Sequence, residues 1–153
     1  MPIGDEELRA CCASRRWIEA VRGRGPAELR AVSAAVLDGL DWTDVEEALA
    51  AHPRIGDRVA GGDRESAWSR GEQSGMDAAA DGVRTALVAG NRAYEERFGH
   101  VFLICATGLS AAGMLAALRE RLGNDAAAER AVVRTELAKI VDLRLAKLIE
   151  EPK

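Results

Sequence analysis

The sequence predicts an all-α protein, folded as a single-domain bundle of about eight helices. Its composition is rich in alanine and leucine but only 4% aromatic, which favours helices over strands. Apolar residues recur at spacings of three and four, as they do on the buried face of a helix. A chain of 153 residues suits one hydrophobic core, so we expect a single domain over residues 1–153.

Each expected helix is marked by its apolar spacing and by residues that start or stop helices. The eight helices are expected at Asp5–Ala13, Arg15–Val21, Ala27–Leu37, Asp41–Ala51, Arg64–Ser74, Met76–Phe98, Ser110–Leu122 and Asp125–Glu150. Asp5, Ser14, Asp41 and Ser110 are expected to cap their helices, because a side-chain oxygen there can accept a hydrogen bond from the first turn. The exception is Val101–Ala106, a wholly apolar run between glycines, which predicts a short, buried extended segment near 101–106.

Charge and composition exclude several classes of function. A net charge of −4 argues against a nucleic-acid surface, and no stretch reaches the roughly 18 apolar residues that a membrane span needs. The acidic start, Met1–Glu7, does not look like a signal peptide. We therefore expect the three cysteines to be reduced thiols in a cytoplasmic protein. Two histidines and no Cys-x-x-Cys spacing argue against a metal site.

The stretch from Asp41 to Gly75 carries the first candidate site. His52 precedes Pro53, which ends the helix before it, so the imidazole is expected at a helix end, open to a cleft. Its unperturbed pKa lies near neutrality. Ser69, Glu72 and Gln73 share one face of the next helix, at spacings of three and four. Taken alone, a histidine before a proline is more often a turn residue, and such a polar face is usually solvated.

The last expected helix contains a charged residue on an apolar stripe. The stripe runs at steps of three and four through Val133, Leu137, Ile140, Arg144 and Leu148. An arginine there is costly unless its charge meets an anion. It is either a structural cation, paired or reaching the edge of the core, or a fixed cation that binds an anionic ligand through its two-pronged guanidinium.

Five short stretches, in order along the chain, together form a specific pattern. They are Ala51–Gly56, Trp68–Gln73, Phe98–Gly108, Leu122–Asp125 and Lys139–Leu145. With them the chain resembles the 2-oxo-4-hydroxy-4-carboxy-5-ureidoimidazoline (OHCU) decarboxylase family, the cofactor-free enzymes of the last step from urate to allantoin. The resemblance extends from about Leu40 to the end of the chain, and Cys11–Trp17 also looks like bacterial members.

The resemblance implies an all-helical homodimer that converts OHCU to S-(+)-allantoin without cofactor or metal. It implies that His52 and Glu72 perform the central chemistry. It also implies a substrate-binding set of Pro53, Ser69, Gln73, Arg144 and the backbone of Val101, Phe102, Leu103 and Ile104. Which of His52 and Glu72 donates the final proton stays open.

Two positions depart from the family pattern, and two other functions compete. Gly113 stands where an acidic residue is expected, which weakens a capping box at Ser110. His100 stands where many members carry an aromatic or apolar residue, and we interpret it as a structural or pocket-edge residue. The competing functions are a non-catalytic helical binding or assembly module and a decarboxylase of a related ureido or imidazoline acid.

Overall fold

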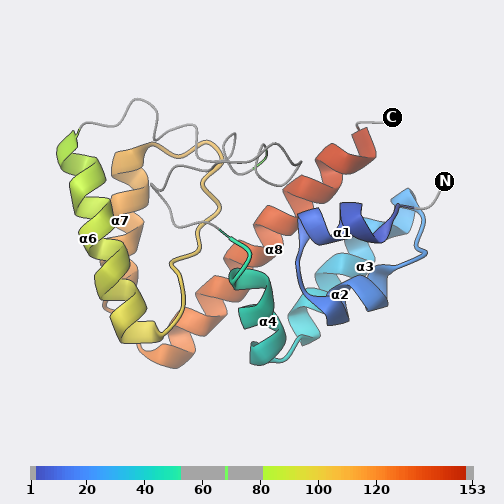
Figure 1. Cartoon of the computed structure of the whole chain (residues 1–153), viewed down its shortest axis with the longest axis horizontal. Helices are drawn as coiled ribbons and strands as arrows, with labels where there is room; N and C mark the ends of the chain where they lie inside the picture. Colours follow the sequence, from blue (N-terminus) through green and yellow to red (C-terminus); the bar gives the residue numbers. More distant parts are fainter. Residues whose placement is uncertain (1–2, 53–67, 69–80, 151–153) are drawn as a thin grey trace. The chain divides into compact units, whose positions relative to one another are not determined.

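The computed structural model describes residues 3–52, 68 and 81–150, and within these ranges it is helical without any strand. The predicted all-α class is therefore confirmed. The helices are α1 (Asp5–Cys11), α2 (Arg15–Val21), α3 (Pro26–Gly39), α4 (Trp42–Leu49), α6 (Asp81–Phe98), α7 (Ala111–Arg121) and α8 (Ala126–Glu150) (Figure 1). Of the helix expected at Arg64–Ser74, only Trp68 lies in the described part, where it is helical and buried.

The chain divides into two compact units. We call Met1–Ala51 with Arg134–Lys153 the terminal unit, and His52–Val133 the central unit. The terminal unit contains α1 to α4 and the C-terminal part of α8, whereas the central unit contains α6, α7 and the first turns of α8. No helix within the described ranges combines the length and the apolar character that crossing a bilayer requires.

Helix packing buries the expected apolar faces of the terminal unit. α1 packs against α2, and α2 packs against α3. Trp17, Ile18 and Val21 are all buried, which confirms the stripe predicted for α2. The buried Trp17 indole keeps its hydrogen bond, because Nε1 donates to Ser33 Oγ at 3.0 Å.

Two of the four predicted side-chain caps are confirmed and two are wrong. Ser14 Oγ accepts from the Trp17 N–H, and Ser110 Oγ accepts from the Gly113 N–H at 3.1 Å. The cap at Ser110 therefore forms with glycine at the third helical position. The side chains of Asp5 and Asp41, by contrast, form no capping hydrogen bond.

Both aspartates bind arginines instead. Asp5 is the first residue of α1, after Gly4 at the N-cap, and it accepts two hydrogen bonds from Arg22 at 2.9 and 2.7 Å. Asp41 does occupy the N-cap position of α4, but its Oδ2 accepts from Arg16 at 3.0 Å. A charge-assisted bond to a guanidinium is stronger than one to a neutral N–H, which explains the exchange of partner.

Three helices, α1, α4 and α7, end one or two residues earlier than predicted, whereas α3 ends at Gly39, two residues later than predicted. α1 stops at Cys11 instead of Ala13, because Cys12 takes an extended conformation (φ −155°, ψ 116°) that turns the chain into the cap of α2. α4 stops at Leu49 instead of Ala51. α3 begins at Pro26, which was predicted to open this helix.

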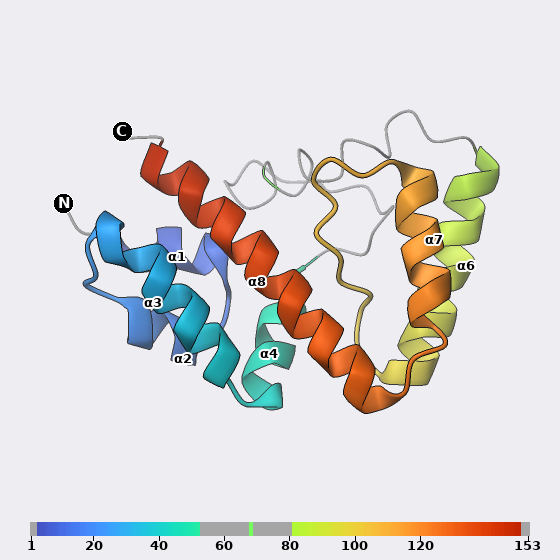
Figure 2. The same ribbon diagram turned by 180° about the vertical axis from the view of Figure 1, so that it is seen from behind.

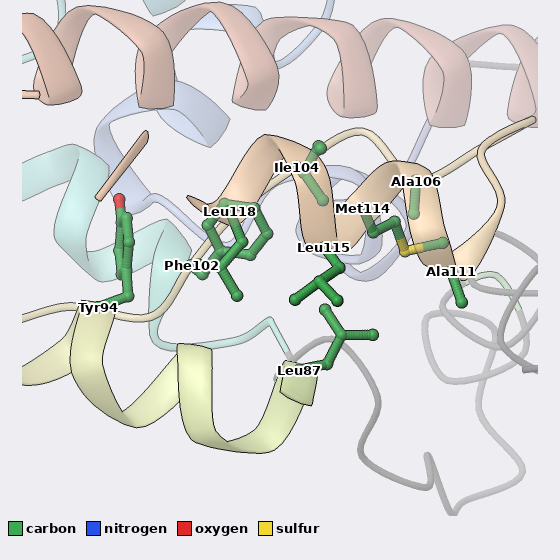
Figure 3. Close-up of a cluster of buried hydrophobic side chains, with 9 residues drawn as sticks. All are labelled: Leu87, Tyr94, Phe102, Ile104, Ala106, Ala111, Met114, Leu115 and Leu118. Atoms are coloured by element: carbon green, nitrogen blue, oxygen red, sulfur yellow. The ribbon is translucent and has the colours of Figure 1, made fainter. Parts of the chain in front are cut away.

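The core of the central unit is built between α6, α7 and the extended segment, which lie side by side in both views (Figure 2). Residues 101–106 are not helical, and this confirms the predicted extended segment. The core consists of Leu87, Tyr94, Phe102, Ile104, Ala106, Ala111, Met114, Leu115 and Leu118 (Figure 3). α6 and α7 meet closely at Gly90, where an added Cβ would lie 2.5 Å from Leu118 Cδ2.

Candidate functional site

His52 lies three residues beyond the end of α4. The Ala50 N–H still donates to Glu46 O at 3.0 Å, and the Ala51 N–H donates to Ala48 O at 3.2 Å, so the chain leaves the helix through a tightened last turn. The His52 side chain is half-buried. Its place just after a helix end agrees with the prediction, although the helix ends two residues earlier than expected.

Four of the predicted site residues lie outside the described part of the chain. They are Pro53, Ser69, Glu72 and Gln73. Their roles, together with the pairing of Glu72 with His52, stay predictions.

Arg144 is buried, with 1% of its surface exposed, and the rest of its stripe on α8 is buried with it. Its NH1 donates to the Ala10 carbonyl oxygen at 3.0 Å, within the terminal unit. Ala10 belongs to the last turn of α1, where carbonyls lack partners inside the helix and the helix dipole is negative. The arginine therefore has a structural partner, the carbonyl of Ala10 at a helix end. Its role as a ligand-binding cation remains a prediction.

The segment Val101–Ile104 is buried at Phe102, Leu103 and Ile104 and half-buried at Val101. Two of its carbonyls already carry partners. The Val101 oxygen lies 3.0 Å from Nδ1 of His100, and the Leu103 oxygen accepts from Arg121 NH1 at 2.7 Å. The structure thus fixes the path of the segment whose backbone is predicted to bind the substrate ring.

His100 lies at the start of this segment, half-buried among aromatic rings. Its ring meets Tyr94 edge-on, with centroids 5.4 Å apart, and stacks on Phe98 at 6.2 Å. These contacts support the structural role that we predict for it.

A buried polar network that the sequence did not predict contacts the segment Val101–Ile104. Arg121, at the end of α7, donates from Nε and NH2 to Glu129 Oε2 at 2.9 and 2.5 Å. The Tyr94 hydroxyl donates to the same oxygen, and Asn124 Nδ2 donates to Glu129 Oε1 at 3.1 Å. The guanidinium also lies over the Phe102 ring, with Cζ 4.5 Å from its centroid.

Burial and charge shift the pKa of two members of this network in opposite directions. Burial favours the neutral form of Glu129, but the hydrogen bonds from Arg121 and Tyr94 outweigh it, so the pKa of the carboxyl is lowered. Burial raises the pKa of the Tyr94 phenol, and its hydrogen bond to Glu129 raises it further. The network therefore holds an ionised carboxylate against a neutral phenol.

The sequence pattern that singles out Arg144, a charged residue at the spacing of an apolar stripe, also occurs in this network. Arg121 follows the buried Leu118 by three residues, and Glu129 precedes the buried Val133 by four. Each is a charged residue on an apolar stripe. The two lie at helix ends, where charged residues are usual, so the pattern stands out less than it does for Arg144 in mid-helix.

Two hollows on the terminal unit contain no predicted site residue. One, of about 640 Å³, is lined mainly by charged side chains of α1, α2 and α4, and the other, of about 430 Å³, lies between α3 and α8. Among the described residues, no three His, Cys, Asp or Glu side chains gather as metal ligands do. The expectation of a metal-free site stays a prediction, since part of the candidate site lies outside those residues.

Comparison with known proteins gives consistent matches. The sequence model of the OHCU decarboxylase family matches residues 5–146. The "Uric acid degradation bifunctional protein TTL" of Arabidopsis thaliana is 32% identical over 99% of this chain, which spans about half (49%) of that protein. The "2-oxo-4-hydroxy-4-carboxy-5-ureidoimidazoline decarboxylase" of Amia calva is 35% identical over 82% of this chain and 73% of its own.

Two solved structures share the fold. A crystal structure of an OHCU decarboxylase in the presence of (S)-allantoin matches 97% of this chain and all of its own, with 30% identity and a TM-score of 0.85. A crystal structure of an (S)-allantoin synthase matches 94% of this chain and 48% of its own, and at 19% identity and a TM-score of 0.68 it supports the fold alone. The match to the family model over most of the sequence, together with these relatives, shows that the chain belongs to the OHCU decarboxylase family.

Proposed function

We propose that this protein is a carboxy-lyase that converts OHCU to S-(+)-allantoin, without a cofactor, in urate degradation. The observation that carries the proposal is the structural match, over nearly the whole of both chains, to an OHCU decarboxylase crystallised with (S)-allantoin. The plant relative named for uric acid degradation supports the same pathway.

The chemistry asks little of the protein beyond placement and one proton. The bond between the ring carbon and its carboxylate breaks, and carbon dioxide leaves. The electron pair left behind delocalises over the adjacent imine and carbonyl, so no external electron sink is needed. A proton then adds to one face of the ring, and this step sets the handedness of the product. The enzyme supplies orientation, charge stabilisation and that proton.

We assign these tasks to the residues that the family resemblance names. His52 and Glu72 are the acid–base pair. The half-buried position of His52, just beyond α4, supports this assignment, because a general acid or base must be partly accessible. Arg144 binds an anionic or carbonyl oxygen of the substrate. Its burial and its helix-end partner make it a rigid cation.

The remaining substrate contacts come from two other groups. Pro53, Ser69 and Gln73 contact the substrate from the stretch after His52. Backbone groups of Val101–Ile104 bind the ring, supported by the extended course of that segment.

We further propose that the chain is one domain that works as a cytoplasmic homodimer. The family match over residues 5–146 supports a single domain. The family resemblance supports the dimer. The odd number of cysteines, three, with Cys11 next to Cys12, supports a compartment that keeps thiols reduced.

The decisive experiment measures the optical activity of allantoin made from freshly generated OHCU. Without enzyme, protonation from both faces gives a racemate. With the protein at high concentration and at early times, we expect only the dextrorotatory S form. Racemic product under those conditions would leave a binding module as the better interpretation. Slow turnover on OHCU with fast turnover of another ureido acid would indicate a shifted substrate.

Two controls test the role of His52 and the independence of the reaction from a metal. His52→Ala should abolish turnover and keep the helical circular dichroism, because the imidazole lies beyond the helix end. Exhaustive dialysis against a chelator should leave wild-type activity intact. Loss of activity that only a metal restores would contradict the cofactor-free mechanism.

A further inference from the structure

One arginine contacts the extended segment Val101–Ala106 through both its backbone and a side chain. The Arg121 guanidinium uses three of its nitrogens and one of its faces on neighbouring groups. NH1 binds the Leu103 carbonyl, Nε and NH2 bind Glu129, and the face covers Phe102.

The carboxylate that binds the arginine is itself held by three donors. Glu129 is fully buried at the start of α8 and accepts from Arg121, from the Tyr94 hydroxyl of α6 and from Asn124 in the α7–α8 turn. The backbone oxygen of Asn124 accepts from Arg97 of α6 at 2.5 Å. Two helices and the turn therefore fix the guanidinium, and the guanidinium fixes the segment.

We propose that Arg121 is a positioning residue for substrate binding: anchored by Glu129 and Tyr94, it sets the backbone of Phe102–Ile104 that receives the ring. The inference rests on the proposed function, since it concerns how that site is shaped. Arg121 touches no substrate in this account. It acts through the Leu103 carbonyl and the Phe102 ring.

The chemistry of the guanidinium explains why lysine cannot replace it. A lysine keeps the charge beside Glu129 but offers one compact ammonium, without a planar fork and without a flat face for Phe102. Arg121→Lys should therefore keep an ion pair and release Leu103. Misplacement of a binding group by about 1 Å can cost up to a hundredfold in rate or affinity. We expect a rise in KM of about tenfold.

The kinetic signature separates positioning from general damage. A backbone group that binds the ring holds substrate and transition state alike, so its displacement raises KM while kcat stays within about threefold. Two matched variants serve as controls. Arg119→Lys makes the same change on the same helix at an exposed position. Leu87→Ala removes packing from the same core.

The experiment measures kcat, KM and thermal stability for wild type and the three variants, and records backbone amide NMR signals of residues 102–104. Expected results are a higher KM and shifted amide signals for Arg121→Lys, with wild-type KM for Arg119→Lys and for Leu87→Ala despite the lower stability of the latter. An unchanged KM for Arg121→Lys overturns the inference, as does an equal rise for Leu87→Ala.

A second variant covers the case in which Arg121→Lys does not fold. Tyr94→Phe keeps the ring beside Phe102 and removes only the hydroxyl that holds Glu129. A KM raised about twofold or more supports the inference, and a KM equal to that of wild type overturns it. The two proposals can be refuted separately. An inactive wild-type protein refutes the proposed function. An active wild type whose KM is unchanged by Arg121→Lys refutes only the positioning role.

Discussion

The terminal and central units use the same arginine–carboxylate chemistry in opposite surroundings. In the terminal unit, Arg30 forms a two-pronged pair with Asp142 at 2.8 and 2.6 Å, but the two side chains are 52% and 45% exposed. In the central unit, Arg121 and Glu129 are 8% and 0% exposed. Water solvates Arg30 and Asp142 whether or not they pair, so this pair stabilises the fold little. Water cannot replace the partner of Arg121 or Glu129 in the same way, because both side chains are buried.

The contrast shows where polar contacts determine structure. The surface pair links α3 and α8 through side chains that water also solvates. The buried network instead holds a stretch of backbone that forms no helix, and its carboxylate depends on the donors around it. Removing one member of the network should therefore cost far more than removing one member of the surface pair.

The largest effect is expected for Glu129→Gln, which keeps the shape and removes the charge. Arg121 would remain buried without its ionic partner, and breaking a buried pair in this way costs about 3–5 kcal/mol. We expect the free energy of unfolding, measured by urea denaturation, to fall by about 3 kcal/mol. A loss below about 1 kcal/mol would show that the buried pair stabilises the protein no more than the exposed pair does.

The next effect is expected where α6 and α7 meet. Gly90→Ala places a methyl group 2.5 Å from Leu118 Cδ2. Overpacking of about 1–3 kcal/mol should exceed the gain of up to about 1 kcal/mol in helix propensity. The control is Gly39→Ala in the terminal unit, where an added Cβ meets nothing within 4 Å. Thermal denaturation should show a lower midpoint for the first variant and an equal or higher one for the second.

A smaller effect is expected at alkaline pH. Tyr94 is the only tyrosine of the chain, so ultraviolet difference spectra report its ionisation alone. Burial and the hydrogen bond to Glu129 raise its folded pKa above the ordinary 10.0. The unfolded chain therefore ionises first, so the contribution of Tyr94 to stability is complete below pH 10 and is lost as pH rises toward the folded pKa.

The phenolate signal should accordingly appear only together with unfolding. Tyr94→Phe should remove this part of the alkaline loss of stability. Ionisation of the phenol near pH 10 in a chain that is still folded would show that the network is open to water.

The smallest effect is expected for Asp142→Asn. The hydrogen bond to Arg30 lowers the pKa of this carboxyl below its ordinary value of 3.8, so any contribution is present above that pH and is lost as pH falls through the lowered pKa. Because both partners are about half exposed, urea denaturation at neutral pH should not distinguish this variant from wild type. A marked loss would place this pair in the same class as Arg121–Glu129.

Local patterns predicted the features that depend on near neighbours. The stripe of Trp17, Ile18 and Val21, the cap at Ser14 and the extended run Val101–Ala106 all involve residues close in sequence, and the structure confirms them. Membership of the family was likewise predictable, since its short stretches occur in order along the chain.

Long-range pairing explains the errors. Asp41 was expected to cap its own helix, but Arg16, 25 residues earlier, takes its carboxylate. The burial of Arg144 followed from its stripe, whereas its partner Ala10 lies 134 residues away. The contact between Arg121 and Leu103 could not be predicted either, because no sequence pattern indicates which backbone carbonyl a buried guanidinium binds.

The two glycines that frame the extended segment have a consequence for which substitutions the protein tolerates. Gly99 ends α6 at φ +80°, and Gly108 takes φ +82° in the turn closed by the Leu109 N–H to Ala106 O bond. A Cβ at either position would touch nothing within 4 Å, yet the backbone conformation itself disfavours any side chain. A saturation mutagenesis screen for activity should therefore find both positions restricted to glycine although they lie in open space. It should find apolar exchanges accepted at Ile104, whose side chain belongs to the buried core.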